Sequence, residues 1–565
     1  MDRNFILALL LSIIIIISFQ FYYQSVAPPP PKKPATTTEA SKETGPQKAA
    51  PEPAPRVEKA PQPVPEPKVS QPLVPTETAA AEVRTVVDTP KYEAILTSNG
   101  AKIVSFRLKD YTTQINGSDL EDLFQAEGRD TSGPSVMFTR RDETFNDAGL
   151  NYHTDAKPSI KITGTGKTSV TYEATTAAGL TIAKTYTFDS ETYDVGFSLA
   201  LTNNSSEDRN YLITFPWRKF YPGEEGQRFA WNSAEILLDG VLKDYYFKDI
   251  KGDEEPSGQV EWAGLGDVYF FKALVFNKKP AAKVTLFKPS NDKIAEIWVR
   301  YGGVDLPPGK PVTTDLKLYM GPKLQEALET AGDNLPRALI YSNYRILDLM
   351  SKYLVEFLKF CHNGFTVAGV TVPGTGNYGW DIIILTIFIK ILFIPLTHKS
   401  MKSMKRMQEI QPQLQKIKEK FKDDKAAINK ATMELFREQK VSPLGGCWPM
   451  FLQLPVFIAL YQALSYAIEL RHAHFVCIPS IFLCINDLSA PDPYYVTPVL
   501  MGGTMVLQQW MTPSGGDPMQ KKMMLLMPVV FTYMFLSFPS GLVLYWLVSN
   551  VLSIGQQIIT NRMAD

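Results

Sequence analysis

Apolar segments long enough to cross a lipid bilayer constrain this chain more than any other feature of its sequence. Residues 5–23 form an apolar run without a charged residue. A helix of this length crosses a hydrocarbon core of roughly 30 Å at about 1.5 Å per residue. The pattern predicts a multi-domain membrane protein with an α-helical part of six spans. Five further apolar segments lie near the C-terminus, at residues 381–396, 448–470, 495–511, 523–538 and 542–559.

The N-terminal run has two interpretations. Ser25-Val26-Ala27 resembles a signal-peptidase site, which would make the run a cleaved signal peptide. The run is longer than a typical signal core, however, and Pro28 directly after the site should hinder cleavage. We therefore expect residues 1–24 to be an uncleaved transmembrane anchor.

The next stretch is rich in proline. Fifteen prolines lie between Pro28 and Pro75, among many Ala, Glu, Lys and Thr residues. This composition lacks the apolar side chains needed to bury a core. Residues 25–89 are therefore predicted to be an extended, disordered linker.

Residues 90–321 change to a period of two. Val195, Phe197, Leu199 and Leu201 alternate with small or polar residues, as in a strand with one buried face. Many such runs separated by turn residues predict a large all-β antiparallel sandwich. Common nucleotide-binding and hydrolase motifs do not occur, so we expect a binding or spacer role and no enzyme. The other runs are 92–97, 102–108, 159–163, 169–174, 180–188, 268–276, 283–287, 294–299 and 312–319.

Residues 322–378 are predicted to be helical, and their second half is amphipathic. Charged side chains from Arg345 to Lys359 recur every three or four residues, and apolar side chains fill the other side. This pattern favours a helix that lies in the membrane interface. Packing of the same helix on the β domain is the alternative.

Lys and Arg in the short loops predict the orientation. Residues 398–440 hold ten Lys and two Arg against six Asp and Glu, a net charge of +6. Lys521 and Lys522 precede the fifth span, and Arg562 follows the sixth. Because positively charged loops stay in the cytoplasm, we expect both termini there. The β domain then lies outside, in the periplasm of a cell with two membranes.

Lys390 is the sharpest feature of the second span. A charge in hydrocarbon costs several kcal/mol unless it meets water, a partner or the interface. One interpretation is a water-filled cavity in the helical bundle, where a positive charge attracts acidic or polar segments; snorkelling to the cytoplasmic interface is the alternative. Polar residues available to line such a cavity are Thr386, Gln453, Gln462, Ser549, Asn550 and Gln556.

Residues 398–440 are predicted to form an amphipathic helical hairpin. Apolar residues recur at spacings of three and four, Pro412 breaks the first arm, and residues 422–425 make the turn. The apolar stripe has no evident partner inside the loop, and the basic face suits anionic lipid or ribosomal RNA. A solvated loop is the alternative. The basic residues expected to make these contacts are Lys405, Arg406, Lys416, Lys418, Lys420, Lys422, Lys521 and Lys522.

Four cysteines are too few for a disulfide scaffold. Two of them, Cys477 and Cys484, fall in the predicted outer loop between the third and fourth spans, where Pro479 would let the chain double back. Free thiols are the first expectation. A disulfide, or a zinc site with His472 and His474, also remains open.

Three groups of motifs in the membrane part resemble the YidC family of membrane protein insertases. Residues 442–447 (SPLGGC), followed by 453–457 (QLPVF), resemble the start of the family's third span. DLSA and DPYY within residues 487–495 resemble its outer loop. Residues 538–545 (FPSGLVLY), followed by 548–550 (VSN), resemble its last hairpin.

This resemblance covers roughly residues 90–565 and implies a function. The family has a periplasmic β-supersandwich, an interfacial helix and a five-helix insertase core, here at residues 379–565. The core would hold a hydrophilic groove through which the protein inserts and chaperones inner-membrane proteins, alone or with the Sec translocon. The groove residues implied are Lys390, Thr386, Gln453, Gln462, Trp546, Asn550 and Gln556.

The chain departs from the family pattern in three places. Lys390 stands where the family usually carries Arg, so the charge is kept but the bidentate fork is lost. Trp546 stands where a Tyr often sits. The tail after the last span is short, so ribosome contact would fall to the hairpin and the loop of Lys521 and Lys522. The expected partners are nascent membrane proteins, the Sec translocon, ribosomes and lipid, with no DNA, cofactor or metal.

Two other functions stay open. A transporter for an anionic solute would use Lys390 as its site and predicts inverted repeats or broken helices, but no internal repeat is evident in the sequence. A cell-wall or sugar-modifying enzyme would need paired carboxylates or histidines in the β domain, where His153 is the only histidine.

Overall fold

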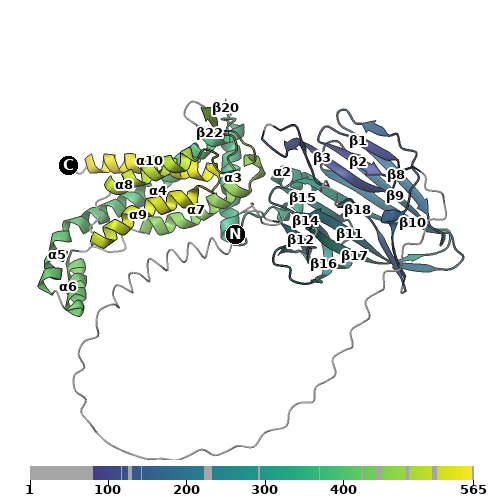
Figure 1. The fold of residues 1–565 in the computed structure, drawn as a ribbon, viewed down its shortest axis with the longest axis horizontal. Coiled ribbons are helices and arrows are strands. Elements are labelled where there is room, and N and C mark those ends of the chain that lie inside the picture. The colour runs from purple at the N-terminus through teal and green to yellow at the C-terminus, as the bar shows by residue number, and fades with distance from the viewer. Residues whose placement is uncertain are drawn as a thin grey trace, which may run out of the picture. The chain divides into compact units, whose positions relative to one another are not determined.

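The computed structural model describes most of the chain from residue 81 onward. The predicted anchor, residues 1–24, and the predicted linker up to residue 80 lie outside the described residues. The described chain has an all-β part followed by a mainly helical part (Figure 1). The described residues are 81–115, 117–124, 130–141, 143–221, 232–289, 293–367, 370–421, 424–439, 448–478, 483–511 and 518–562.

Eighteen described strands form the β domain. They are β1 (Arg84–Asp88), β2 (Tyr92–Thr97), β3 (Lys102–Thr112), β4 (Leu120–Asp122), β5 (Met137–Arg140), β6 (Glu143–Asn146), β7 (Ser159–Lys161), β8 (Lys167–Thr175), β9 (Leu180–Asp189), β10 (Asp194–Asn203), β11 (Arg209–Phe220), β12 (Ser233–Leu238), β13 (Val241–Tyr246), β14 (Ser257–Gly266), β15 (Phe270–Phe276), β16 (Ala281–Leu286), β17 (Ile294–Leu306) and β18 (Pro311–Pro322), with the short η1 (Asp147–Gly149) after β6.

These strands make two sheets. A five-stranded sheet has the order β4-β3-β2-β1-β7. A 13-stranded sheet runs β6-β5-β11-β17-β16-β14-β15-β18-β10-β9-β8, with β12 and β13 beside β14. The all-β prediction is confirmed. One pair, β1 with β7, is parallel, which the predicted antiparallel sandwich did not include.

Long alternating strands were predicted, and continuously buried strands were predicted only in part. Strands β9 and β10 pair along their whole length and bury every second residue, as the alternation around Val195 requires. Strand β15 is buried at all seven positions and lies in the predicted run 268–276, whereas β12, buried at all six positions, was not predicted. Strand β1 lies inside the predicted linker, and the β domain therefore begins at Arg84, before the predicted boundary at residue 90.

Among the buried lysines of the β domain, two are covered almost completely, Lys184 and Lys272. Lys184 pairs with Asp147 at 2.6 Å, and both side chains are fully buried. Within the part of the chain that the structure describes, the Nζ of Lys272 has no hydrogen-bond partner. Its ammonium lies over the rings of Phe124, at 4.1 Å from the centroid, and Trp217, at 5.5 Å.

The helical part follows β18. Its elements are α2 (Gln325–Ala331), η2 (Leu335–Ala338), α3 (Arg345–Asn363), β19 (Gly364–Val367), β20 (Val370–Pro373), α4 (Tyr378–Glu409), α5 (Gln411–Lys420), α6 (Lys425–Glu438), α7 (Trp448–Tyr466), η3 (Ile468–Leu470), β21 (Val476–Ile478), β22 (Leu483–Ile485), α8 (Val496–Met511), α9 (Pro518–Phe535) and α10 (Ser540–Arg562).

Helices occupy all five apolar segments predicted near the C-terminus. Two stretches in the described chain are long and apolar enough to cross a membrane, Tyr378–Met407 in α4 and Ser540–Thr560 in α10. Leu525–Phe535 in α9 is a shorter apolar helix. Length and composition therefore support two spans directly, rather than the predicted six.

Helix α3 packs on other helices through its buried side. Ser351 Oγ donates to the carbonyl of Ala459 on α7 at 3.0 Å, and Phe357 stacks on Phe388 of α4 at 5.1 Å. The opposite side of α3 exposes Ile346 (74%) and Tyr353 (69%). The residues after α3 are not helical, as residues 322–378 were predicted to be, because the chain turns into the β19–β20 hairpin.

The amphipathic hairpin contains its own small core. Helix α4 ends at Glu409, and Pro412 stands in the first turn of α5, so the predicted break is confirmed. Ile410 and Leu414 pack with Leu435 of α6. The prediction that the apolar stripe has no partner within the loop was therefore wrong, because the second arm folds back and covers part of it.

Cys477 and Cys484 form a disulfide across the hairpin of β21 and β22. Free thiols, the first expectation, were wrong at these two positions. The disulfide also removes both thiolates from any zinc site with His472 and His474.

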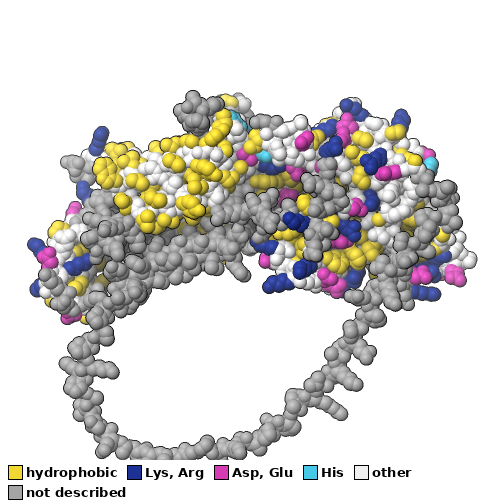
Figure 2. All heavy atoms as spheres, in the orientation of Figure 1, with side chains coloured by type: hydrophobic (Ala, Val, Ile, Leu, Met, Phe, Trp, Pro, Cys, Tyr) yellow, Lys and Arg dark blue, Asp and Glu magenta, His cyan; other side chains and the backbone are white. Residues whose placement is uncertain are grey.

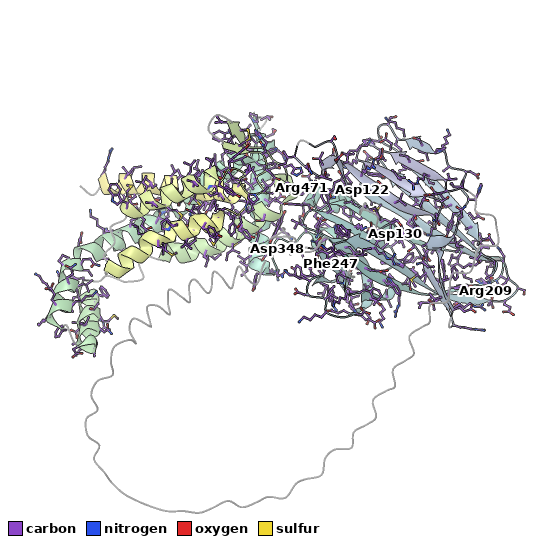
Figure 3. The ribbon with its side chains drawn as sticks, viewed as in Figure 1. Asp122, Asp130, Arg209, Phe247, Asp348 and Arg471 are labelled. Carbon is purple, nitrogen blue, oxygen red and sulfur yellow. A yellow bond between two sulfur atoms is a disulfide. The ribbon has the colours of Figure 1, made fainter. Side chains whose placement is uncertain are left out.

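An ion pair joins the helical part to the β domain. Arg471, labelled in Figure 3, follows η3 and meets Glu121 of β4 at 2.9 Å. Its guanidinium also lies 5.2 Å from the ring centroid of Phe270. Tyr269 Oη donates to the carbonyl of Ser465 at 3.3 Å, close to the same junction.

Candidate functional site

One side of helix α10 carries a stripe of polar residues. Asn550, Ser553, Gln556 and Gln557 are spaced three, three and one residues apart, so they share a side of the helix. Their partners lie on α4 and α8. Asn550 Nδ2 donates to Thr504 Oγ1 at 3.2 Å, and Gln557 Nε2 donates to the carbonyl of Met511 at 2.9 Å. We call these four residues the α10 stripe.

Lys390 reaches the α10 stripe from α4. Its Nζ donates to Ser553 Oγ at 2.6 Å, and the side chain is half-buried. Ser553 in turn donates to the carbonyl of Ser549 at 2.8 Å. The ammonium therefore has a neutral partner, and it forms no ion pair with a described residue.

Two turns further along α4, a second contact joins the same helices. Gln556 Nε2 donates to Thr397 Oγ1 at 2.9 Å. Thr397 also donates to the carbonyl of Phe393 in its own helix. Helix α10 is thus held to α4 by a charged and a neutral hydrogen bond, within a bundle whose described exterior is largely apolar (Figure 2).

The other predicted groove residues lie in different surroundings. Thr386 is fully buried and donates to the carbonyl of Ile382 in its own helix at 2.6 Å. Gln462 is also fully buried, and neither of its amide atoms has a hydrogen-bond partner among the described residues. Gln453 Nε2 is 3.4 Å from Tyr545 Oη, a long contact. None of these three residues forms a hydrogen bond with Lys390 in the described chain.

Trp546 belongs to an aromatic cluster. Its ring meets Phe457 of α7 edge-on at 4.8 Å, and Phe535 and Phe531 of α9 lie 5.2 and 6.3 Å away. These contacts join α10 to α7 and α9. Trp546 is therefore half-buried among rings rather than beside the lysine.

The predicted cytoplasmic contact residues are exposed where the structure describes them. Lys405 and Arg406 lie near the end of α4, and Lys416, Lys418 and Lys420 lie on α5. They all lie on the first arm of the hairpin, before and after the buried Ile410 and Leu414. Lys422 lies outside the described residues, as do the side chains of Lys521 and Lys522.

Sequence reasoning missed the partners of the polar residues. Ser553, Thr397, Thr504 and Gln557 complete the contacts of the α10 stripe, but none was predicted. The polar spacing from Asn550 to Gln557 was a signal for the two on α10. Thr397 and Thr504 are single hydroxyls in apolar helices and gave no comparable signal.

Comparisons with known proteins agree across most of the chain. Residues 370–565 match the family described as "60Kd inner membrane protein", and residues 84–356 match "YidC periplasmic domain". The "Membrane protein insertase YidC" of Geotalea daltonii is 38% identical over 481 residues, which cover 84% of this chain and 86% of that protein. The protein of the same name from Geobacter metallireducens is 37% identical over 526 residues, covering 92% and 91%.

A solved structure also matches. An active YidC insertase with its first transmembrane domain resolved has 19% sequence identity and a TM-score of 0.37, over 85% of this chain and 94% of that chain. The relatives above share enough identity, over enough of their length, to establish the relationship. The chain belongs to the YidC family of membrane protein insertases, an inner-membrane family that is not a family of enzymes.

Proposed function

We propose that this protein inserts and chaperones integral membrane proteins through a hydrophilic groove beside the α10 stripe, with Lys390 as its charged residue. The observation that carries the proposal is the position of the Lys390 ammonium, which meets a serine hydroxyl on α10 rather than a carboxylate. A cation without a counter-ion keeps an attraction for negative groups. An incoming segment with acidic or polar residues would supply them.

The proposed mechanism needs no energy-supplying reaction. A client's apolar segment leaves the cytoplasm while its polar tail passes along the groove. Polar side chains of the groove replace part of the water that the tail would lose, which lowers the cost of crossing hydrocarbon. Burial of the apolar segment in lipid, at about 25 cal/mol per Å², then completes insertion.

Two observations support the proposed orientation. The Cys477–Cys484 disulfide lies in the loop between α7 and α8, and disulfides persist in oxidising compartments such as the periplasm. The hairpin of α5 and α6 carries the excess of Lys and Arg that marks cytoplasmic loops. We propose six spans, including the N-terminal anchor, with both termini in the cytoplasm and the β domain in the periplasm.

The partners follow from the same arrangement. The exposed lysines of α5 suit anionic lipid or ribosomal RNA, and the exposed apolar side of α3 suits the outer membrane interface. Nascent membrane proteins are the proposed clients. Cooperation with a Sec translocon is part of the proposal through the family resemblance.

The test varies client charge and groove charge together. Purified Lys390→Glu is compared with wild type for insertion of matched clients that differ only in the charge of the translocated tail. A close pair of unit charges in water is worth about 1 kcal/mol, so reversing the sign changes the interaction by about 2 kcal/mol, or roughly 30-fold. We expect that loss for acidic tails and little change for neutral ones.

Two variants serve as controls. Lys390→Arg keeps the charge and is expected to retain insertion, and Lys390→Ala is expected to fall between Arg and Glu. Equal responses of acidic and neutral tails to Lys390→Glu would contradict the electrostatic role and favour a snorkelling lysine. Flux of a labelled anion in the same vesicles, without insertion, would favour the transporter instead.

A further inference from the structure

Between α3 and α4 the chain makes a hairpin that contains no charged residue. Residues 363–380 lack Asp, Glu, Lys, Arg and His, and β19 and β20 lie within them. A two-stranded hairpin is only marginally stable in water, and its open, uncharged edges invite aggregation. Something other than bulk water is therefore expected to cover this segment.

The hairpin has one apolar face and one polar face. Phe365 and Val372 lie opposite each other across the strands and are 37% and 42% exposed. Thr366 and Thr371 form the next pair, on the other face, and their hydroxyls meet at 3.1 Å. The two described pairs thus present one apolar and one polar face, as for a hairpin lying at a boundary between apolar and polar surroundings.

The apolar face continues into neighbouring exposed apolar surface. Phe365 stacks on Phe360 of α3 at 4.5 Å, and Phe360 is itself 47% exposed. Towards α4 the chain reaches Trp380, which is 55% exposed in the first turn of a helix long enough to cross the membrane. The hairpin therefore bridges α3 and the outer end of this span.

The disulfide-bonded hairpin of β21 and β22 holds the end of the uncharged segment that leads into α4. Asn377 Nδ2 donates to the carbonyl of Phe475 at 3.1 Å, and the Phe475 ring meets Trp380 edge-on at 5.8 Å. Figure 1 shows β20 and β22 at the same end of the helical part as α3. The bracing contacts fix how the chain enters α4 and thus which way the hairpin projects.

We propose that the β19–β20 hairpin is a membrane anchor that lies in the interfacial layer of the outer leaflet, with Phe365 and Val372 facing the acyl chains. The proposal rests on the proposed function only in taking α4 as a span with its N-terminus outside. Unpaired strand edges are not tolerated in hydrocarbon, so the hairpin lies at headgroup depth, where water satisfies its free N–H and C=O groups. The occupant of the apolar face is lipid.

The experiment reads the depth of single side chains. The full chain carries Cys361→Ala and Cys447→Ala, keeps its disulfide, and receives one new cysteine labelled with an environment-sensitive fluorophore. The variants are Val372→Cys, its neighbour Thr371→Cys, and Val241→Cys as the matched control. Val241 is also an exposed valine in a strand, 60% exposed in β13 of the β domain. Each is reconstituted in vesicles with lipids brominated near the headgroup.

We expect the label at Val372 to be quenched several-fold more than the label at Val241, with Thr371 closer to the control. Adding Phe365→Asp to Val372→Cys should reduce the quenching. Equal quenching at Val372 and Val241 would overturn the proposal. Self-quenching of the Val372 label at high protein density would also overturn it, because a second copy of the chain would then cover the hairpin. The same vesicles are assayed for insertion, so loss of insertion with intact quenching at Val372 would count against the proposed function alone.

Discussion

A fully buried lysine of the β domain and a half-buried lysine of the helical part have opposite kinds of partner. In the β domain, Lys184 has a carboxylate at 2.6 Å and also donates to the carbonyl of Gly100 at 2.8 Å. In the helical part, the hydrogen-bond partner of Lys390 among the described residues is the hydroxyl of Ser553, at 2.6 Å. The first charge is neutralised inside the fold, and the second is not.

This difference distinguishes a charge that is paired within the fold from one that can bind a ligand. Burial lowers the pKa of Lys184, and the nearby Asp147 opposes that effect. A pair of this kind is self-contained and offers nothing to a ligand. A lysine whose partner is a neutral hydroxyl can exchange it for an incoming carboxylate at little cost, which is what a client-binding groove requires.

Removing one partner of the β-domain pair should have the largest effect. Asp147→Leu leaves Lys184 buried without a counter-charge, and such losses cost about 3–5 kcal/mol of unfolding free energy. The measurement is thermal unfolding of the full chain in detergent, followed by the β-sheet circular dichroism signal.

The matched control replaces both partners. Asp147→Leu with Lys184→Met removes both charges together and should cost clearly less than Asp147→Leu alone. If the double variant is as unstable as the single one, the pair stabilises the fold through packing. Charge neutralisation would then not distinguish Lys184 from Lys390.

Replacing Lys272 should change stability by an intermediate amount, and it should stabilise the β domain rather than destabilise it. Burial lowers the pKa of Lys272 well below its usual value, with Lys219 adding to the shift. Its ammonium lies over aromatic rings and has no hydrogen-bond acceptor among the described residues, and an unsatisfied buried polar group costs about 1–3 kcal/mol. Lys272→Met should therefore raise the stability of the β domain by an amount of that order.

The lowered pKa of Lys272 also predicts how the stability gained by Lys272→Met should vary with pH. The folded pKa is below the unfolded value, so the unfolded chain binds more protons between the two and stability rises with pH there. Below the folded pKa the cost of Lys272 is present in full. The gain from Lys272→Met should thus be larger at about pH 6 than at about pH 10, near the unfolded value. A gain independent of pH would indicate improved packing alone.

The smallest expected effect concerns Ser553. Ser553→Ala removes the resting partner of Lys390, a hydrogen bond worth about 1 kcal/mol, or roughly fivefold in binding. Clients with acidic tails should be captured up to that much more tightly, while neutral tails should not change. The measurement is the affinity of both client types for the reconstituted variant.

Thr560→Ala is the control for this prediction. Thr560 lies on the same helix and donates only within it, to the carbonyl of Gln556 at 2.9 Å. It should leave the ratio of acidic to neutral clients unchanged. Ser553→Ala combined with Lys390→Ala should also show no charge preference, and a preference that persists there would place the attracting charge elsewhere.

Sequence patterns predicted the local elements well and the irregular segments poorly. The period of two around Val195 predicted β10, and the break at Pro412 was correct. The β19–β20 hairpin was missed inside a segment predicted to be helical, although Phe365 and Val372 alternate with threonines at the period of a strand. Short strands beside a long helix are easily absorbed into it, because their signal extends over only four residues each.

The candidate site was predictable by residue type but not by contact. Lys390 was identified because a charge inside an apolar segment needs a physical explanation. Thr386 and Gln462 looked equally suitable for a groove, yet both are fully buried. A polar residue on an apolar helix has several directions available, and its sequence position alone does not select one.

The sequence by itself determined which segments are apolar enough for a membrane, which alternate as strands, and where positive charge gathers. These properties depend on residues within a few positions of each other, so they are readable along the chain. Only the tertiary structure decided that Lys390 meets Ser553, 163 residues away, and that Cys477 is bonded to Cys484. Partners of this kind are set by how whole helices and loops pack, and that packing minimises the free energy of all the buried surfaces together rather than that of any one segment.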